Sequence, residues 1–143
     1  MLEEAWQEFG PLPPVRPIFR ATIPLPPSLN SAYPSNKTTG RRYASEALTI
    51  FKAEAIPLIR QARNEQEYDA PLNASYRLVL RLWFADQRSY NASDASNRIK
   101  AAEDALADAL EFNDNHVQDV RSIKCGVDSD NPRCEIELEV SYR

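Results

Sequence analysis

Two aspartates bracket a short polar stretch of the chain, residues 94–117, in which chemistry could take place. Asp94 stands just before an expected helix, and Asp114 lies in the short connection that follows that helix. Carboxylates from two separate loops suit Mg²⁺, which takes hard oxygen ligands, keeps several waters and binds phosphate oxygens in its remaining positions. Lys100, between them in sequence, could then neutralise charge that develops on the phosphate. The alternative is structural, because aspartates are common helix caps and turn residues.

The helix that must position these groups is expected over residues 96–110, with Ser93 or Ser96 as its N-terminal cap. Asn97, Lys100 and Asp104 fall within about 60° of one another on a helix, so they form a polar stripe. The buried stripe points elsewhere and consists of Ile99, Ala102, Leu106 and Leu110. Asp114 can reach the polar stripe only if the chain folds back after the helix.

Period-two and helical patterns place the remaining elements around this helix. The expected elements are a strand over residues 18–25, a helix over 43–63 that is kinked or broken near Pro57, a strand over 76–84, and strands over 117–127 and 133–142. Residues 28–40 and 85–95 are expected to be loops. The order β-α-β-α-β-β predicts an α+β two-layer fold, with helices on one face of a mainly antiparallel sheet.

The last two strands are predicted to pair as a hairpin centred between Ser129 and Asp130. Such a hairpin would place Cys125 directly opposite Cys134. These cysteines lie too close to one end to hold the whole chain together, so we expect free thiols that act as small buried residues. Redox or metal chemistry at this pair is the alternative.

Length and composition are those of one domain, because 143 residues suffice for a core and no apolar run approaches membrane-spanning length. Residues 1–17 contain four prolines and are expected to form an extended N-terminal arm before a single domain over residues 18–143. The first residues are acidic and no apolar segment of a secretory signal follows, so a cytoplasmic protein with no membrane partner is expected. Glycine-rich phosphate loops and dinucleotide motifs are absent, which disfavours a nucleotide cofactor or another small-molecule substrate.

Charge is unevenly distributed along the chain, although the net charge is only −4. Residues 37–63 hold six lysines and arginines against two acids, whereas residues 101–119 hold six acids and no lysine or arginine. A basic track for DNA phosphates beside an acidic metal site would have this pattern. The acids could equally solvate one helix face.

Residues 94–117 resemble the signature of the RusA-type Holliday junction resolvases, which runs D-x-D-N-x-x-K-x-x-x-D-x-L and continues after the helix with D-D-x-x-V. The matching residues are Asp94, Asn97, Lys100, Asp104, Leu106, Asp114 and Val117. Nearer the N-terminus, residues 26–33 read Pro-Pro-Ser-Leu-Asn-Ser-Ala-Tyr and match the family's P-P-S-x-N-x-x-Y. The two motifs stand in the right order, and the resemblance covers about residues 18–140.

The resemblance implies a homodimeric, Mg²⁺-dependent endonuclease, with Mn²⁺ as a substitute, that nicks four-way DNA junctions symmetrically during recombination and repair. A two-fold dimer suits a two-fold symmetric junction. Asp94 and Asp114 would be the metal ligands, and together with Lys100 they would form the catalytic set. The family often accompanies phages, so a bacterial or phage-infected cell is the expected setting.

Two positions depart from the family pattern. Ser96 stands where the second aspartate of D-x-D-N is expected, and Asn113 stands where the first residue of the D-D pair is expected. Loss of an anionic ligand at Ser96 weakens a magnesium site. Ser96 could still coordinate the ion through its hydroxyl or a water, and Glu103 or Asp104 could supply a replacement carboxylate. An active nuclease and a junction-binding, weakly active or inactive relative are therefore the two alternatives within the family.

Basic and amide side chains around this segment are the expected DNA contacts. Lys37, Arg41 and Arg42 lie near the start of the helix over 43–63 and could follow the phosphates. Asn30, Asn97 and Arg88 complete the expected DNA-binding set. The alternative outside the family is an acidic α+β interaction protein that docks a partner through its proline-rich arm.

Overall fold

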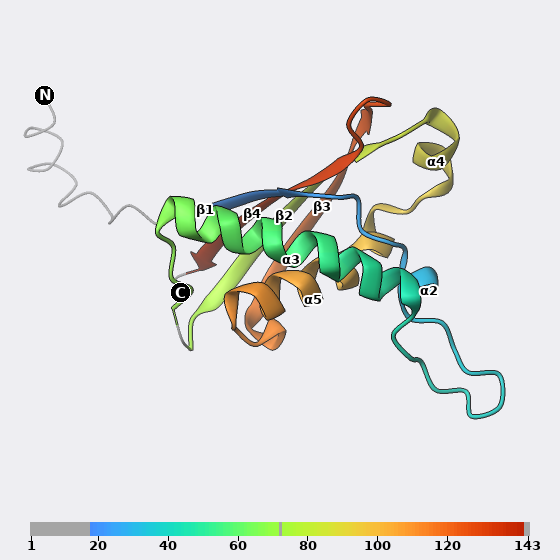
Figure 1. Cartoon of the computed structure of the whole chain (residues 1–143), viewed down its shortest axis with the longest axis horizontal. Helices are drawn as coiled ribbons and strands as arrows, with labels where there is room; N and C mark the ends of the chain where they lie inside the picture. Colours follow the sequence, from blue (N-terminus) through green and yellow to red (C-terminus); the bar gives the residue numbers. More distant parts are fainter. Residues whose placement is uncertain (1–17, 72, 142–143) are drawn as a thin grey trace, which may run out of the picture.

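A four-stranded mixed sheet forms one layer of the computed structural model, which describes residues 18–71 and 73–141 (Figure 1). Its strands are β1 (Ile18–Ile23), β2 (Ser75–Phe84), β3 (Val117–Val127) and β4 (Arg133–Ser141), in the spatial order β1-β4-β2-β3. β4 is antiparallel to both of its neighbours, β1 and β2, whereas β3 runs parallel to β2. The predicted α+β fold with a mainly antiparallel sheet is confirmed. The arm predicted over residues 1–17 and the end of the last predicted strand at 142 lie outside the described residues.

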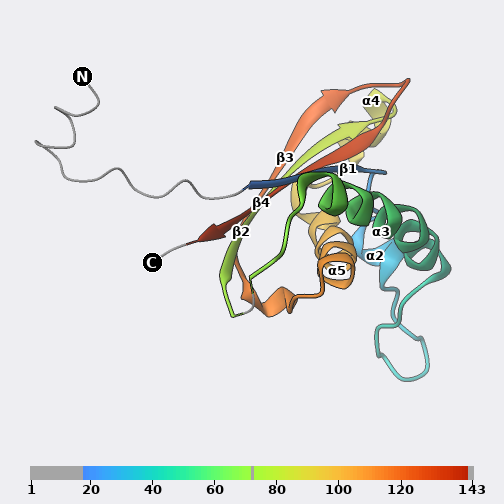
Figure 2. The same cartoon turned by 60° about the vertical axis from the view of Figure 1, so that its left-hand side comes forward.

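Two long helices, α3 (Glu46–Gln66) and α5 (Ile99–Leu110), pack side by side on one face of the sheet (Figure 2). Ser45 caps α3 by accepting a hydrogen bond from the Leu48 amide. The helix is continuous through Pro57, where a kink or a break is predicted, so it is not broken there. The core between helices and sheet is built from apolar helix stripes and inward-facing strand residues, among them Phe19, Phe51, Leu78, Leu80, Leu106, Ile136 and Leu138. None of the helices in this described part of the chain is long and apolar enough to cross a membrane.

Two short helical turns fall in predicted loops, a third covers the start of the helix predicted over residues 96–110, and a fourth lies in the connection after that helix. They are α2 (Leu29–Ala32), α4 (Gln87–Ala92), the 3₁₀ turn η1 (Ala95–Arg98) and the 3₁₀ turn η2 (Asp114–His116). The Ser28 hydroxyl caps α2 and the Asp86 carboxylate caps α4, each by accepting from the amide three residues ahead. η1 leads directly into α5, so neither Ser93 nor Ser96 caps that helix as predicted. Turns of three to six residues are too short for apolar periodicity to reveal them.

The predicted hairpin between the last two strands is wrong, because β2 lies between β3 and β4. Leu82 of β2 pairs with Lys124 on one side and with Cys134 on the other, so the two cysteines do not face each other across a ladder. The cause is the crossover: β2, α5 and β3 form a parallel β-α-β unit, and β4 returns along the opposite edge of β2. Both cysteines are free, and burial raises the pKa of the Cys134 thiol to about 12, which suits a small buried residue.

One side chain of α3 bonds to the outer edge of the sheet. The Gln66 amide accepts a hydrogen bond from the Arg20 main-chain N–H at 3.1 Å and donates one to the Arg20 carbonyl at 2.6 Å. β1 is an edge strand whose partner β4 lies on its other side, so these two main-chain groups point away from the sheet. Gln66 thus satisfies both of them, as a neighbouring strand would.

Candidate active site

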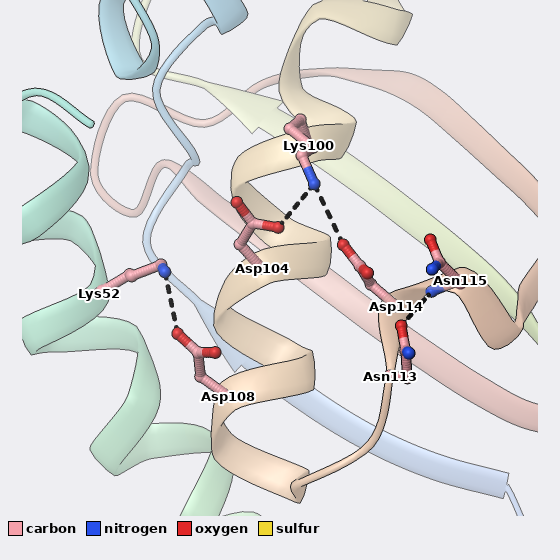
Figure 3. Close-up of polar contacts among 7 residues, drawn as sticks. All are labelled: Lys52, Lys100, Asp104, Asp108, Asn113, Asp114 and Asn115. Atoms are coloured by element: carbon pink, nitrogen blue, oxygen red, sulfur yellow. Dashed lines mark hydrogen bonds and ion pairs between the residues drawn. The ribbon is translucent and has the colours of Figure 1, made fainter. Parts of the chain in front are cut away.

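The candidate site lies beside α5, at the point where the chain folds back after the helix. Glu111 ends α5 in the left-handed region, at φ 60°, and its amide donates to the Ala107 carbonyl. Asn113 then begins η2, because its side-chain oxygen accepts from the Asn115 amide at 3.0 Å (Figure 3). These two local signals bring Asp114 back against the side of the helix. The reversal that the site requires is therefore present.

Lys100 lies between two carboxylates. Its Nζ donates to Asp104 Oδ1 at 2.9 Å and to Asp114 Oδ2 at 3.0 Å (Figure 3). The Lys100 side chain is 48% exposed, whereas those of Asp104 and Asp114 are 18% and 30% exposed. One cation therefore serves two largely covered carboxylates, and we call these three residues the Lys100 cluster.

The surroundings of the Lys100 cluster oppose ionisation of Asp104 and of the adjacent Glu103. Burial, and then the neighbouring carboxylates of Asp114 and Asp108, raise the pKa of Asp104 to about 6. Burial also raises the pKa of Glu103, while Lys100 lowers it and Asp114 raises it by smaller amounts. An added cation favours the ionised form of such crowded carboxyl groups. The electrostatics of this region therefore suit a bound divalent ion.

Asp94 and Ser96 lie on the approach to α5, outside the Lys100 cluster. Both side chains are exposed, and the Asp94 carboxylate is 3.5 Å from the side-chain nitrogen (Nδ2) of Asn97. Among residues 18–71 and 73–141, no group of three or more histidine, cysteine, aspartate or glutamate side chains is gathered closely enough to hold a metal ion. The structure thus brings Lys100, Asp104 and Asp114 together and joins Asp94 to Asn97 instead.

Three side chains that the sequence does not single out hold the segment around Asp94. Arg98, Ser122 and Lys124 each donate a hydrogen bond to a group within residues 93–95. Two of them come from β3, which follows α5 in sequence. A side chain that bonds to the main chain of a distant segment leaves no periodic pattern, so only the fold reveals these contacts.

Three basic residues that are predicted to contact DNA lie on a loop before α3. The loop comprises residues 34–43 and projects from the body of the molecule (Figures 1 and 2). An isolated antiparallel bridge and a 2.7 Å main-chain hydrogen bond close this loop on itself. Lys37 and Arg41 are exposed on it. Arg42 is exposed as well, but its guanidinium also donates to the Tyr33 carbonyl at 2.9 Å. The loop therefore presents at least two uncommitted cations at some distance from the sheet.

The other predicted DNA contacts are spread over three elements. Asn30 is exposed on α2, Arg88 is exposed on α4, and Asn97 lies half-buried in η1, where it meets Asp94. These positions stay predictions, as do the roles assigned to the acids and to Lys100.

Comparison with protein families gives a match that spans both sequence motifs. Residues 24–139 match the family model described as Endodeoxyribonuclease RusA. The matched region begins before α2 and includes η1, all of α5, η2 and most of β4. A search of curated proteins finds no match. Because the family match covers most of the sequence, this chain belongs to the RusA endodeoxyribonuclease family.

Proposed function

We propose that this protein is an active, divalent-metal-dependent endonuclease that nicks four-way DNA junctions. Membership of the RusA family implies a Holliday junction resolvase, which acts in DNA recombination. The observation that supports activity in this particular chain is the Lys100 cluster, where a lysine and two largely covered carboxylates meet within the matched segment. Metal-assisted phosphate hydrolysis uses these side-chain types.

Asp104 and Asp114 are the residues that would hold the ion, with Asp94 contributing from the approach to α5. All three present carboxylate oxygens, and Mg²⁺ usually binds through one or two carboxylates while it keeps several waters. The bound ion would act as a Lewis acid on the phosphoryl oxygen and would lower the pKa of a water. Asp104 shares Lys100 with Asp114, so it is better placed than Glu103 to replace the carboxylate that is missing at Ser96.

Lys100 would change partners during the reaction. In the absence of a metal ion it pairs with the two carboxylates of its cluster. Once those carboxylates are engaged elsewhere, its flexible and half-exposed side chain is free to face a DNA phosphate. There it would stabilise the charge that develops on the phosphate during cleavage.

The projecting loop and α4 would supply DNA contacts that do not depend on base sequence. Lys37 and Arg41 at the loop, and Arg88 on α4, are exposed cations suited to phosphate binding. A homodimer would present two equivalent sites to the two-fold symmetric junction. Binding of this kind weakens steeply as salt rises, because phosphate contacts release counterions.

Ser96 supports a second candidate function within the same family. A neutral hydroxyl stands there in place of an expected anionic ligand, and the exposed serine makes a weaker metal site. A protein that holds junctions without cutting them would retain the DNA-binding surface and lose only the chemistry.

A nicking assay distinguishes these candidates. The substrates are a synthetic four-way junction with fixed arms and a matched linear duplex, each with Mg²⁺ or Mn²⁺. We expect paired nicks on the junction, and a loss of at least about 100-fold in Asp114→Asn, because the site then lacks one ligand. Asp108→Asn is the matched control, since Asp108 lies nearby on α5 but pairs with Lys52. Junction-selective binding without cleavage by the native protein would establish the second candidate, and no selective binding would overturn both.

A further inference from the structure

The segment that carries Asp94 has little of its own to hold it. η1 is a 3₁₀ turn of four residues, and the Asp94 side chain makes no capping hydrogen bond to it. The exposed carboxylate has one contact among the described residues, the 3.5 Å approach of Asn97. The direction in which Asp94 points therefore depends on what fixes the main chain on either side of it.

Arg98 ties this segment to two other parts of the fold. Its Nη2 donates to the Ser93 hydroxyl at 2.8 Å, and its Nη1 donates to the Pro26 carbonyl at 2.6 Å. Its guanidinium also lies over the ring of Phe84, 5.7 Å from the centroid. Pro26 follows β1 and Phe84 ends β2, so three segments that are distant in sequence meet at this one half-buried side chain.

Two residues of β3 hold the same segment from another side. Lys124 Nζ donates to the Ser93 carbonyl at 2.8 Å, and Ser122 Oγ donates to the Ala95 carbonyl at 2.6 Å. Ser122 and Lys124 are two positions apart on the strand, so they share one face of the sheet. The residues that precede and follow Asp94 are thus both anchored to the scaffold.

We propose that Arg98 is a positioning residue for junction cleavage, which fixes residues 93–95 against the turn after β1 and so aims the Asp94 carboxylate. This inference rests on the proposed function. The planar guanidinium holds its donors in a rigid fork, so it fixes two acceptors in set directions while it lies over an aromatic ring, whereas an ammonium is a point charge on a flexible stem. Replacement of a residue that orients a metal ligand in this way typically lowers metal affinity or activity by about 10- to 100-fold.

The test compares Arg98→Lys with Arg133→Lys in the full chain. Arg133 is a matched control, because it also lies over an aromatic ring of β2, 4.9 Å from the centroid of Trp83, and donates to Asp128 at 2.8 Å. It holds the turn between β3 and β4 rather than the Asp94 segment. The readouts are Mn²⁺ affinity without DNA by electron paramagnetic resonance, the Mn²⁺ midpoint of junction nicking, and hydrogen exchange of the amides of residues 93–98 and 128–133.

Arg98→Lys is expected to accelerate exchange in residues 93–98, to weaken Mn²⁺ binding by about 10-fold and to raise the nicking midpoint equally. Arg133→Lys should accelerate exchange in residues 128–133 alone. Unchanged exchange in residues 93–98 of Arg98→Lys would overturn the anchoring, and faster exchange with unchanged Mn²⁺ affinity would overturn the positioning role. A native protein that neither binds Mn²⁺ nor cuts junctions would overturn the proposed function and the positioning role with it, whereas the exchange result would still decide the anchoring.

Discussion

Two lysines pair with carboxylates along α5, and they differ in how much of the carboxylate charge each one balances. Lys52 of α3 meets Asp108 alone, at 2.8 Å, across the interface between the two helices. Lys100 meets Asp104 and Asp114 together, so one ammonium serves two carboxylates. The first is an ordinary ion pair with a half-buried lysine and an exposed aspartate, worth about 0–1 kcal/mol. The comparison teaches that uncompensated charge, rather than the number of acids on a helix, distinguishes the candidate site from a solvated surface.

Replacing Lys100 with methionine should have the largest effect on cleavage, and the same change at Lys52 should have almost none. Junction cleavage is expected to fall about 100- to 1,000-fold, because the phosphate loses its cation in the transition state. Mn²⁺ binding should nevertheless become tighter, because Asp104 and Asp114 no longer share an internal cation. Lys52→Met is the control and should change neither the single-turnover nicking rate nor the Mn²⁺ affinity by more than about twofold. Equal losses in the two variants would mean that the Lys100 cluster is only another surface ion pair.

A carboxylate introduced at Ser96 should strengthen metal binding, whereas one introduced on a distant turn should not. Ser96→Asp is expected to lower the Mg²⁺ midpoint of junction nicking by about 10-fold, because the approach to α5 gains a hard anionic ligand. Ser129→Asp adds the same charge to the exposed turn between β3 and β4, and it should leave the midpoint unchanged. A midpoint that does not move in Ser96→Asp would show that Ser96 lies outside the metal's reach.

The smallest expected effect concerns stability without metal. The pKa of Asp104 is raised to about 6 by burial and then by Asp114 and Asp108, so the folded state binds more protons than the unfolded state between about pH 4 and 6. Stability from this group is therefore present at low pH and is lost as pH rises through that window. Asp104→Asn should raise the free energy of unfolding at pH 7 by about 1–2 kcal/mol, allowing for solvent screening.

Chemical denaturation of native protein and Asp104→Asn at pH 4 and pH 7 measures this difference. The gain should be absent at pH 4, where Asp104 is protonated in the folded state. Asp108→Asn, which breaks the one-to-one pair with Lys52, should lower stability by about 0–1 kcal/mol instead. A loss of stability at pH 7 in Asp104→Asn would show that Lys100 outweighs the burial of this carboxyl group.

Local periodicity was enough to predict the elements that carry the site. The alternation of β2 and the apolar stripe of α5 place these elements within a few residues of their observed bounds. Helical spacing also predicts that Lys100 and Asp104 share a polar stripe, and the ion pair between them agrees with this. The contact of Lys100 with Asp114 needed the chain reversal at Glu111 and Asn113, which no periodic pattern contains.

Relations between distant segments could not be predicted in this way. The position of β2 between β3 and β4 depends on the α5 crossover, so a strand pattern that suits a hairpin was realised in a different sheet order. Arg98 reaches Pro26, which is separated from it by 72 positions in the chain. The charge of Arg98 by itself suggests a solvated residue, and only its acceptors reveal a structural partner.

The hydrogen bonds that Gln66 makes with β1 have a consequence for how copies of this chain can meet. An exposed edge strand is a template on which another strand can add, and such addition leads to uncontrolled association. At Arg20 an incoming strand would first have to displace a side-chain amide that already satisfies both main-chain groups. The β1 border of the sheet is thereby closed at its middle, so sheet extension across β1 from one molecule to the next is disfavoured.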